Sequence, residues 1–278
     1  MSKIWSISTT IRNPKRILLF LEVAAALKGR EWNEETQKLY QILLINCKVY
    51  KPKKYKKYIE DNDITFEIAK KIFENVGYKD PAMRGRQSIN LLKKMGLIDF
   101  NQYNQLVITY TGEELRNEKI TLGDVLLNIN FDSICNIDVN PLITTLEFLV
   151  RLDEKMNLTS KGVSAEEFKY YVMTIQDWFS VERNVNQLIK GRENEEFNLQ
   201  HKKYVIQQYS NFKHVNDYID SISRYFNMSD LLILKYDNIN INRKKIDEII
   251  DIIKMFHNRK RRENMEMLEI AKQQGYIR

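Results

Sequence analysis

The sequence has few of the residues that build disulfide-stapled or zinc-bound folds. Among its 278 residues are two cysteines, Cys47 and Cys135, and three histidines, His201, His214 and His257. Two cysteines are too few for a disulfide framework or a four-thiolate zinc site, and the histidines are too far apart in sequence for metal-ligand spacing. We therefore expect neither kind of scaffold.

Glycine, proline and long apolar runs are also scarce. Nine glycines and four prolines exclude a collagen-like or linker-dominated chain. No stretch approaches the roughly 18 apolar residues of a membrane span, and the N-terminus lacks the pattern of a signal peptide. The sequence thus predicts a cytoplasmic protein without a membrane partner. Phosphate-binding loops, Gly-x-Ser-x-Gly elbows and dinucleotide fingerprints are missing as well.

What the chain does have is apolar residues and a basic balance of charge. Hydrophobic residues make up 43% and aromatic residues 11%, enough for a packed core in one large or two modest domains. Lysine and arginine number 44 against 37 acids, a net charge of +7. This excess suggests a polyanionic partner.

Apolar periodicity and capping signals predict a mostly helical chain. We expect helices over residues 15–28, 33–47, 63–76, 81–95, 140–156, 164–191, 203–212 and 216–226, and a long basic helix after Asn242. Short strand pairs are expected at 97–100 with 106–108 and at 231–234 with 239–241. Thr111 is expected to begin a short helix, Ser164 and Glu167 to form a capping box, and the polar run 191–200 to be a linker.

The order helix, turn, helix, hairpin thus occurs twice, which is typical of a winged helix-turn-helix. The predicted fold class is mainly α with small β-hairpins (α+β), with two winged units joined by a helical segment. The predicted domains are residues 1–120 (first winged unit), 121–200 (helical connection) and 201–278 (second winged unit leading into a linker helix).

Two of the expected helices carry a polar face suited to the major groove. On a helical wheel, residues 86–95 separate an apolar side from Arg86, Gln87, Asn90, Lys93 and Lys94, with no acid among them. Arginine reads guanine, asparagine or glutamine reads adenine, and lysines suit phosphates. Residues 216–227 place Asn216, Asp220, Ser223 and Arg224 opposite an apolar side. The acids on that face would repel phosphates, and an ordinary surface helix explains either pattern as well.

Residues 48–58 hold six lysines, three tyrosines and no acid. Basic residues interleaved with aromatics suit a phosphate backbone, and Lys53, Lys54, Lys56 and Lys57 are the candidate contacts. A solvated loop and helix start is the competing interpretation. The basic run 259–262 precedes three glutamates and fits a helix surface laced with ion pairs.

Catalytic carboxylates are hard to find. Magnesium-dependent nucleases of the restriction class use an Asp followed by Glu-x-Lys. Asp153 and Glu167-Phe168-Lys169 have this sequence pattern. The Glu-x-Lys, however, falls in the first turns of a capped helix and not on a strand beside the aspartate. We therefore assign no catalytic residue and no metal ligand.

These features together resemble the AlwI-like family of type IIS restriction endonucleases, with their nicking relatives. The resemblance is carried by Trp5 to Pro14, Glu31-Trp32-Asn33, residues 86–97, 106–112 and 140–142, and Asp220 with Arg224-Tyr225-Phe226, and it spans residues 5–255. It implies an N-terminal recognition part, a linker and a C-terminal Mg²⁺-dependent nuclease domain, with Arg86, Asp220 and Arg224 contacting DNA. The chain ends at Arg278, near where that nuclease domain would begin, so the resemblance implies that the cleavage part is absent and that this chain itself needs no cofactor.

The leading hypothesis is therefore sequence-specific binding of double-stranded DNA with a short asymmetric site, as the recognition portion of a restriction–modification nuclease. Whether the chain is itself an enzyme stays open. Two alternatives remain: a winged-helix transcriptional regulator without a nuclease partner, which would usually dimerise on a palindrome, and a small complete nuclease using Asp153, Glu167 and Lys169.

Overall fold

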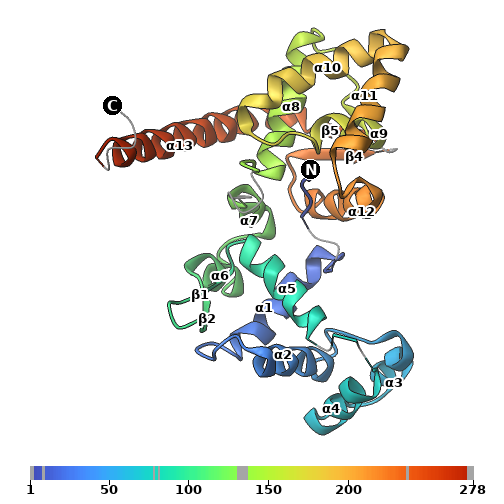
Figure 1. Ribbon diagram of the computed structural model, residues 1–278, viewed down its shortest axis with the longest axis vertical. Coiled ribbons are helices and arrows are strands. Elements are labelled where there is room, and N and C mark those ends of the chain that lie inside the picture. The colour runs from blue at the N-terminus through green and yellow to red at the C-terminus, as the bar shows by residue number, and fades with distance from the viewer. Residues whose placement is uncertain are drawn as a thin grey trace. The chain divides into compact units, whose positions relative to one another are not determined.

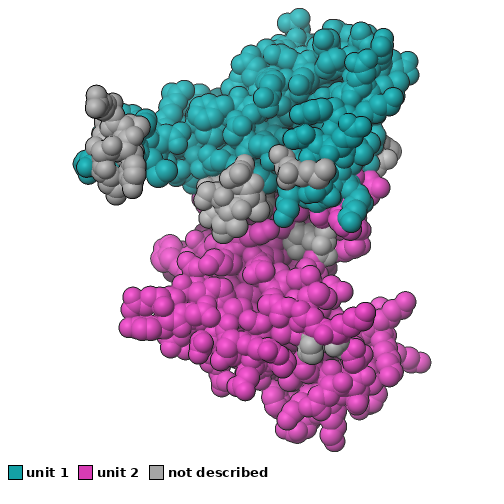
Figure 2. Space-filling model, in the orientation of Figure 1, with its two compact units in different colours: residues 1–5, 132–213, 230–278 teal, residues 6–131, 214–229 magenta. Residues whose placement is uncertain are grey.

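The computed structural model describes residues 3–7, 10–77, 79–80, 82–129, 137–235 and 238–273. The chain is mainly helical, with two small antiparallel sheets in this part of it (Figure 1). It divides into two compact units, coloured separately in Figure 2: unit 1 holds residues 1–5, 132–213 and 230–278, and unit 2 holds residues 6–131 and 214–229. Within the described ranges, every helix is too short or too polar to cross a membrane.

Unit 2 is built from the first half of the chain and one helix from the second half. Its elements are η1 (Pro14–Arg16), α1 (Ile17–Ala25), α2 (Glu34–Asn46), η2 (Lys53–Tyr55), α3 (Lys56–Asp61), α4 (Phe66–Asn75), α5 (Met83–Lys94), β1 (Ile98–Phe100), β2 (Leu106–Ile108), α6 (Tyr110–Arg116), α7 (Leu122–Asn128) and α12 (Val215–Phe226).

Local capping explains where the first helices of unit 2 begin. The Asn33 side chain accepts a hydrogen bond from the Thr36 amide (3.0 Å), and acids Glu34 and Glu35 occupy the first turn of α2. Thr65 caps α4 in the same way. An apolar cluster then joins the helices; its buried members are Ile42, Ile45, Ile59, Ile64, Ala69, Ile72 and Phe73. This cluster holds α3 and α4 against α2.

The predicted start of the helix near residue 111 was wrong by two residues. Thr109, not Thr111, caps α6, because its hydroxyl accepts from the Gly112 amide at 3.0 Å. Gly112 itself has no room for a side chain, since a Cβ there would collide with the Leu97 carbonyl and the Ile108 side chain. The hairpin β1–β2, in which Ile98 pairs with Ile108, is thereby locked against the start of α6.

Unit 1 is built around α8. Its elements are α8 (Pro141–Lys155), β3 (Val163–Ser164), α9 (Ala165–Glu167), η4 (Phe168–Val172), η5 (Trp178–Ser180), α10 (Val181–Glu193), α11 (Glu195–Gln208), β4 (Leu232–Lys235), β5 (Asn238–Ile241), η7 (Arg243–Lys245) and α13 (Ile246–Gln273). Asn140 caps α8 and Pro141 opens it, as predicted. Leu146, Phe148 and Leu152 of α8 are completely buried.

Two predictions in unit 1 were wrong. The helix expected over 164–191 is interrupted: α9 and a π-helical turn end before Met173, and α10 begins only at Val181. The run 191–200 is not a linker, because α10 and α11 are separated by Asn194 alone. The Asn194 side chain accepts a hydrogen bond from the Phe197 amide at 2.9 Å, and two glutamates follow in the first turn of α11. The charged residues of this stretch therefore form the exposed start of a helix.

Both predicted hairpins are confirmed, and the second gains a strand. β4 and β5 pair with Leu232 opposite Ile241, and the two-residue β3 adds to the other edge of β5, with Val163 opposite Ile239. The mainly helical α+β class is confirmed. The winged helix-turn-helix assignment stays a prediction. The domain boundaries at 120/121 and 200/201 also stay predictions, because the two compact units are defined by contacts and not by independent folding.

Candidate nucleic-acid interface

The first predicted DNA-facing helix, α5, packs closely against α2. Its inward face consists of Gly85, Ser88, Ile89, Leu91 and Leu92. The Gly85 amide donates to Gln41 Oε1 at 3.2 Å, and a Cβ at Gly85 would lie 2.8 Å from the Gln37 carbonyl oxygen. Because Gly85 has no side chain, α5 can lie closer to the backbone of α2 than a larger residue would allow.

The outward face of α5 carries most of the predicted contacts. Gln87, Asn90, Lys93 and Lys94 are all exposed. Lys93 donates to Asp99 at 2.9 Å and lies over the Phe100 ring, so it ties the helix to the hairpin. The hydrogen bond from Lys93 lowers the pKa of Asp99. The helix thus presents amides and basic groups, and the nearby Asp99 carboxylate is paired with Lys93.

Arg86 is placed differently from its neighbours. Its guanidinium is paired with Asp80 and donates to Gln37 Oε1 at 3.2 Å, and its side chain is 38% exposed. Arg86 therefore faces α2 and the turn before α5, with two of its nitrogens engaged. Arg84, which the sequence analysis did not single out, is exposed one turn earlier than Ser88. The wheel that began at residue 86 excluded it, although the expected helix began at 81.

The second predicted helix, α12, buries Val215, Ile222, Tyr225 and Phe226 and exposes its polar side. Asn216 and Arg224 are exposed, and Asp220 and Ser223 are half-buried. Arg224 donates to Asp220 at 3.0 Å, and this bond raises the pKa of Arg224. The acids that the sequence analysis expected to repel phosphates are thus paired.

Residues 10–12 connect α5 and α12 within unit 2. The Thr10 hydroxyl lies 3.4 Å from Gln87 Oε1 of α5. Arg12 pairs with Asp217 of α12 at 3.0 Å. The Ile11 carbonyl accepts from the buried Tyr225 hydroxyl at 2.8 Å, and burial raises the pKa of that tyrosine, which stays a neutral donor. One short segment therefore holds the polar faces of both helices, although they lie about 130 residues apart in the chain.

The lysine cluster lies on η2 and α3. Lys53, Lys54, Lys56 and Lys57 are exposed, and none of the four forms an ion pair with an acid in the described ranges. Lys51, by contrast, pairs with Glu60 at 3.1 Å. The four lysines are carried by a firmly packed element, because Ile59 on the opposite side of α3 is completely buried.

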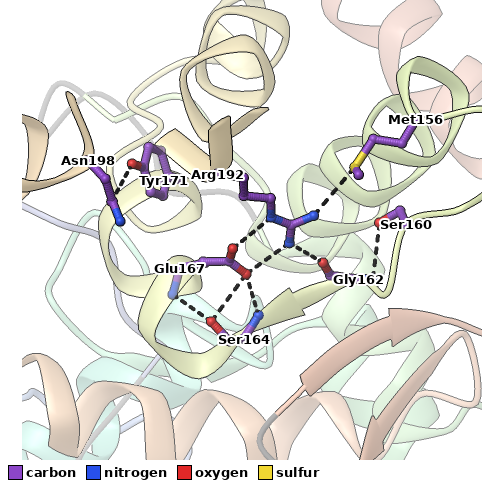
Figure 3. A network of polar contacts seen from close by, with 8 residues as sticks. All are labelled: Met156, Ser160, Gly162, Ser164, Glu167, Tyr171, Arg192 and Asn198. Atoms are coloured by element: carbon purple, nitrogen blue, oxygen red, sulfur yellow. Dashed lines mark hydrogen bonds and ion pairs between the residues drawn. The ribbon is translucent and has the colours of Figure 1, made fainter. Parts of the chain in front are cut away.

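Asp153, Glu167 and Lys169, which match the nuclease sequence pattern, are each paired with a different residue and do not converge on one site. Asp153 pairs with Arg243 at 2.8 Å, and Lys169 pairs with Glu166 at 3.0 Å. Glu167 accepts from Arg192 at 2.7 Å and from the Ser164 amide at 2.8 Å, so it closes a structural network (Figure 3). Burial raises the pKa of Glu167, but these bonds outweigh it and lower the pKa. Over the described ranges, no three acidic, histidine or cysteine side chains converge as metal ligands.

The two cysteines and the basic run 259–262 lie outside the two predicted DNA-facing helices. Cys47 is exposed at the end of α2, because the helix stops there; Cys135 lies outside the described residues. The run 259–262 is held by ion pairs as expected: Arg259 pairs with Glu263, and Lys260 pairs with both Asp138 (2.6 Å) and Glu263.

Comparison with known proteins now adds independent information. No curated protein matches the chain. Among solved structures it is similar to a crystal structure of pyrene- and phenanthrene-modified DNA in complex with the BpuJ1 endonuclease binding domain, at 11% identity and a TM-score of 0.44, over 82% of this chain and 84% of that one. That likeness is too low to assign a fold.

The family model described as AlwI restriction endonuclease matches residues 93–274. The match covers about two thirds of the chain and includes β1, β2, all of unit 1 after residue 137 that the structure describes, and α12. It leaves out the opening segment 5–14, one of the segments that carry the resemblance noted from the sequence. On the strength of this match, the chain belongs to the AlwI restriction endonuclease family.

Proposed function

We propose that the chain binds double-stranded DNA in a sequence-specific manner, as the recognition portion of a type IIS restriction or nicking endonuclease. The observation that carries the proposal is that α5 and α12 belong to one compact unit and that residues 10–12 contact the polar faces of both. Two different helices held together this way favour a single asymmetric site over a palindrome.

In this proposal the two helices and the lysine cluster have separate tasks. Gln87 and Asn90 of α5 and Asn216 and Arg224 of α12 read base edges, since amides and guanidinium groups match the donor and acceptor pattern of the major groove. In the part of the chain that the structure describes, Asp220 holds Arg224 through Nε and Nη2, so Nη1 is left to contact a base, whereas both terminal nitrogens of Arg86 are engaged. Lys53, Lys54, Lys56 and Lys57 contact phosphates, which fixes the protein on the duplex without selecting a sequence. Lys94, and Lys93 with its Asp99 partner, contact DNA phosphates next to the end of α5.

Cleavage is proposed to need carboxylates outside the residues considered above, in a separate or C-terminal nuclease domain with Mg²⁺. The reason is chemical: Asp153, Glu167 and Lys169 are each held in an ion pair with a different partner. Freeing Asp153 or Glu167 to bind a metal would leave Arg243 or Arg192 without its counter-ion. The small complete nuclease is therefore the less favoured candidate.

A selection from a randomised duplex library, with the full chain and without divalent metal, tests the proposal. We expect enrichment of one short asymmetric motif, bound with strong salt dependence. A palindromic motif would favour a dimeric regulator instead. Salt-sensitive binding to every sequence would contradict sequence-specific recognition by this chain, and no binding at all would contradict the DNA proposal.

Binding to the enriched duplex, measured over a range of salt, then locates the phosphate contacts. Lys56→Ala should weaken binding to all sequences alike and reduce the slope of log K against log salt by about one. Lys203 of α11 is a matched control, because it is exposed on unit 1 without an ion pair to a described acid. Lys203→Ala should leave both affinity and slope unchanged.

A further inference from the structure

We propose that Arg84 is the arginine of α5 that reads a base edge, while Arg86 serves the fold of the helix. This inference rests on the proposed function and sharpens it, because it names a specificity-determining residue that the sequence pattern did not single out. Three observations carry it: the position of Arg84 in α5, the freedom of its guanidinium, and the side of the helix on which it lies.

Arg84 occupies the first turn of α5, which begins at Met83. In helices that enter the major groove, the N-terminal residues are the ones that contact base edges. The residues that follow Arg84 on the same side of the helix, Ser88 and Leu91, are buried at 1% and 3% exposure, whereas Arg84 is exposed. Arg84 therefore lies at the edge of the packed face and is the exposed member of this row, at the leading end of the helix.

The two arginines differ in what they already bind. Arg86 is committed to Asp80 and Gln37, and contact with a base would require it to leave both. The Arg84 guanidinium makes no ion pair or hydrogen bond with any residue in the described ranges, although the Ser88 hydroxyl donates to the backbone carbonyl of Arg84. A bidentate contact with guanine needs two free N–H groups on one guanidinium, which Arg84 has.

Arg84 also lies next to Gln87, because residues three apart are neighbours on a helix surface. Gln87 contacts Thr10, and the segment 10–12 contacts α12. Arg84 therefore has as its neighbour the residue that contacts the segment holding α12, while Arg86 contacts α2. An arginine and a glutamine side by side are suited to read neighbouring guanine and adenine.

The test uses the full chain, the duplex enriched by the wild type from a randomised library, and its single-base-pair variants, with affinity measured by fluorescence anisotropy without divalent metal. Arg84→Ala should weaken binding to the enriched duplex about 5- to 150-fold and remove the preference at one or two adjacent positions. Arg84→Lys should lose the same preference, because lysine keeps the charge but not the planar fork. Arg86→Ala should keep it.

The outcomes separate this inference from the proposed function. If the wild type enriches a motif but Arg84→Ala reads it unchanged, the inference is wrong and the function stands. If Arg84→Lys restores full affinity and preference, Arg84 is a phosphate contact and the inference is again wrong. Loss of the preference in Arg86→Ala in place of Arg84→Ala would reverse the assignment. If the wild type enriches no motif, the proposed function itself fails.

Discussion

Replacing Gly85 by alanine is the sharpest test of how α5 is held. The added methyl group would lie 2.8 Å from the Gln37 carbonyl oxygen and 3.5 Å from Tyr40 Cδ1. The first contact is shorter than real Cβ contacts allow, and a backbone carbonyl within α2 has no rotamer by which to move away. The two helices must therefore separate by a few tenths of an ångström.

The size of the effect follows from two opposing contributions. Forcing an extra carbon into a packed contact costs about 1–3 kcal/mol, and alanine stabilises a helix interior by about 0.5–1 kcal/mol relative to glycine. The expected net loss for Gly85→Ala is about 1 kcal/mol, within a range of about 0–2.5 kcal/mol, in the free energy of unfolding of unit 2. For a chain of this size a loss of about 1 kcal/mol lowers the unfolding midpoint by about 2–4 °C.

Asn90→Ala is the matched control, because Asn90 lies on the exposed face of the same helix. It gains helix propensity without meeting a neighbour, so its midpoint should equal or slightly exceed that of the wild type. Thermal and urea unfolding followed by circular dichroism compare the variants. If Gly85→Ala were as stable as Asn90→Ala, the close packing of α5 on α2 would be refuted.

Three further predictions concern unit 1 and the segment 10–12. Glu167→Ala should destabilise the chain by about 1–3 kcal/mol at pH 7, because the carboxylate that accepts from the Ser164 amide and pairs with Arg192 is lost. The pKa of Glu167 in the folded chain lies below its ordinary value of 4.5. The difference in free energy of unfolding between the wild type and Glu167→Ala should therefore persist above pH 4.5 and narrow as the pH falls through the folded pKa. A difference that stays constant in acid would contradict this role of Glu167. Burial lowers the pKa of His201, so the folded chain should lose stability as the pH falls below the ordinary value of 6.5, and His201→Gln should remove part of that slope in urea titrations; an unchanged slope would contradict the assignment. Tyr225→Phe should cost about 1–2 kcal/mol, because the buried Ile11 carbonyl loses its donor, and should weaken binding to the enriched duplex; unchanged unfolding would show that residues 10–12 are not held by this bond.

Local patterns predicted the elements well wherever caps and periodicity agreed. Asn33, Asn140 and Ser164 cap helices where helices were expected to begin, since their side-chain oxygens satisfy amides a few residues away. The prediction of a linker over residues 191–200 was wrong because a high density of charged residues also occurs at exposed helix ends. A single asparagine between two helices leaves almost no trace in a hydropathy pattern.

Contacts between distant segments were beyond the reach of the pattern. The two-residue strand β3 is too short to have a period, and its pairing with β5 joins residues about 75 positions apart. The ion pairs of Arg86 and of Arg12 likewise depend on where α2 and α12 fold back. The wheel identified the exposed face of α5, but it could not show which arginine on that helix was already engaged.

The central claim is that α5 and α12 read one contiguous asymmetric site together. Its most direct test is the set of base preferences lost by Gln87→Ala and by Arg224→Ala, measured with the full chain on every single-base-pair variant of the enriched duplex. The account predicts that each variant loses preference at different positions of the same motif and keeps the others. Loss at the same positions, or at none, would show that the two helices do not read the site side by side and would contradict the account.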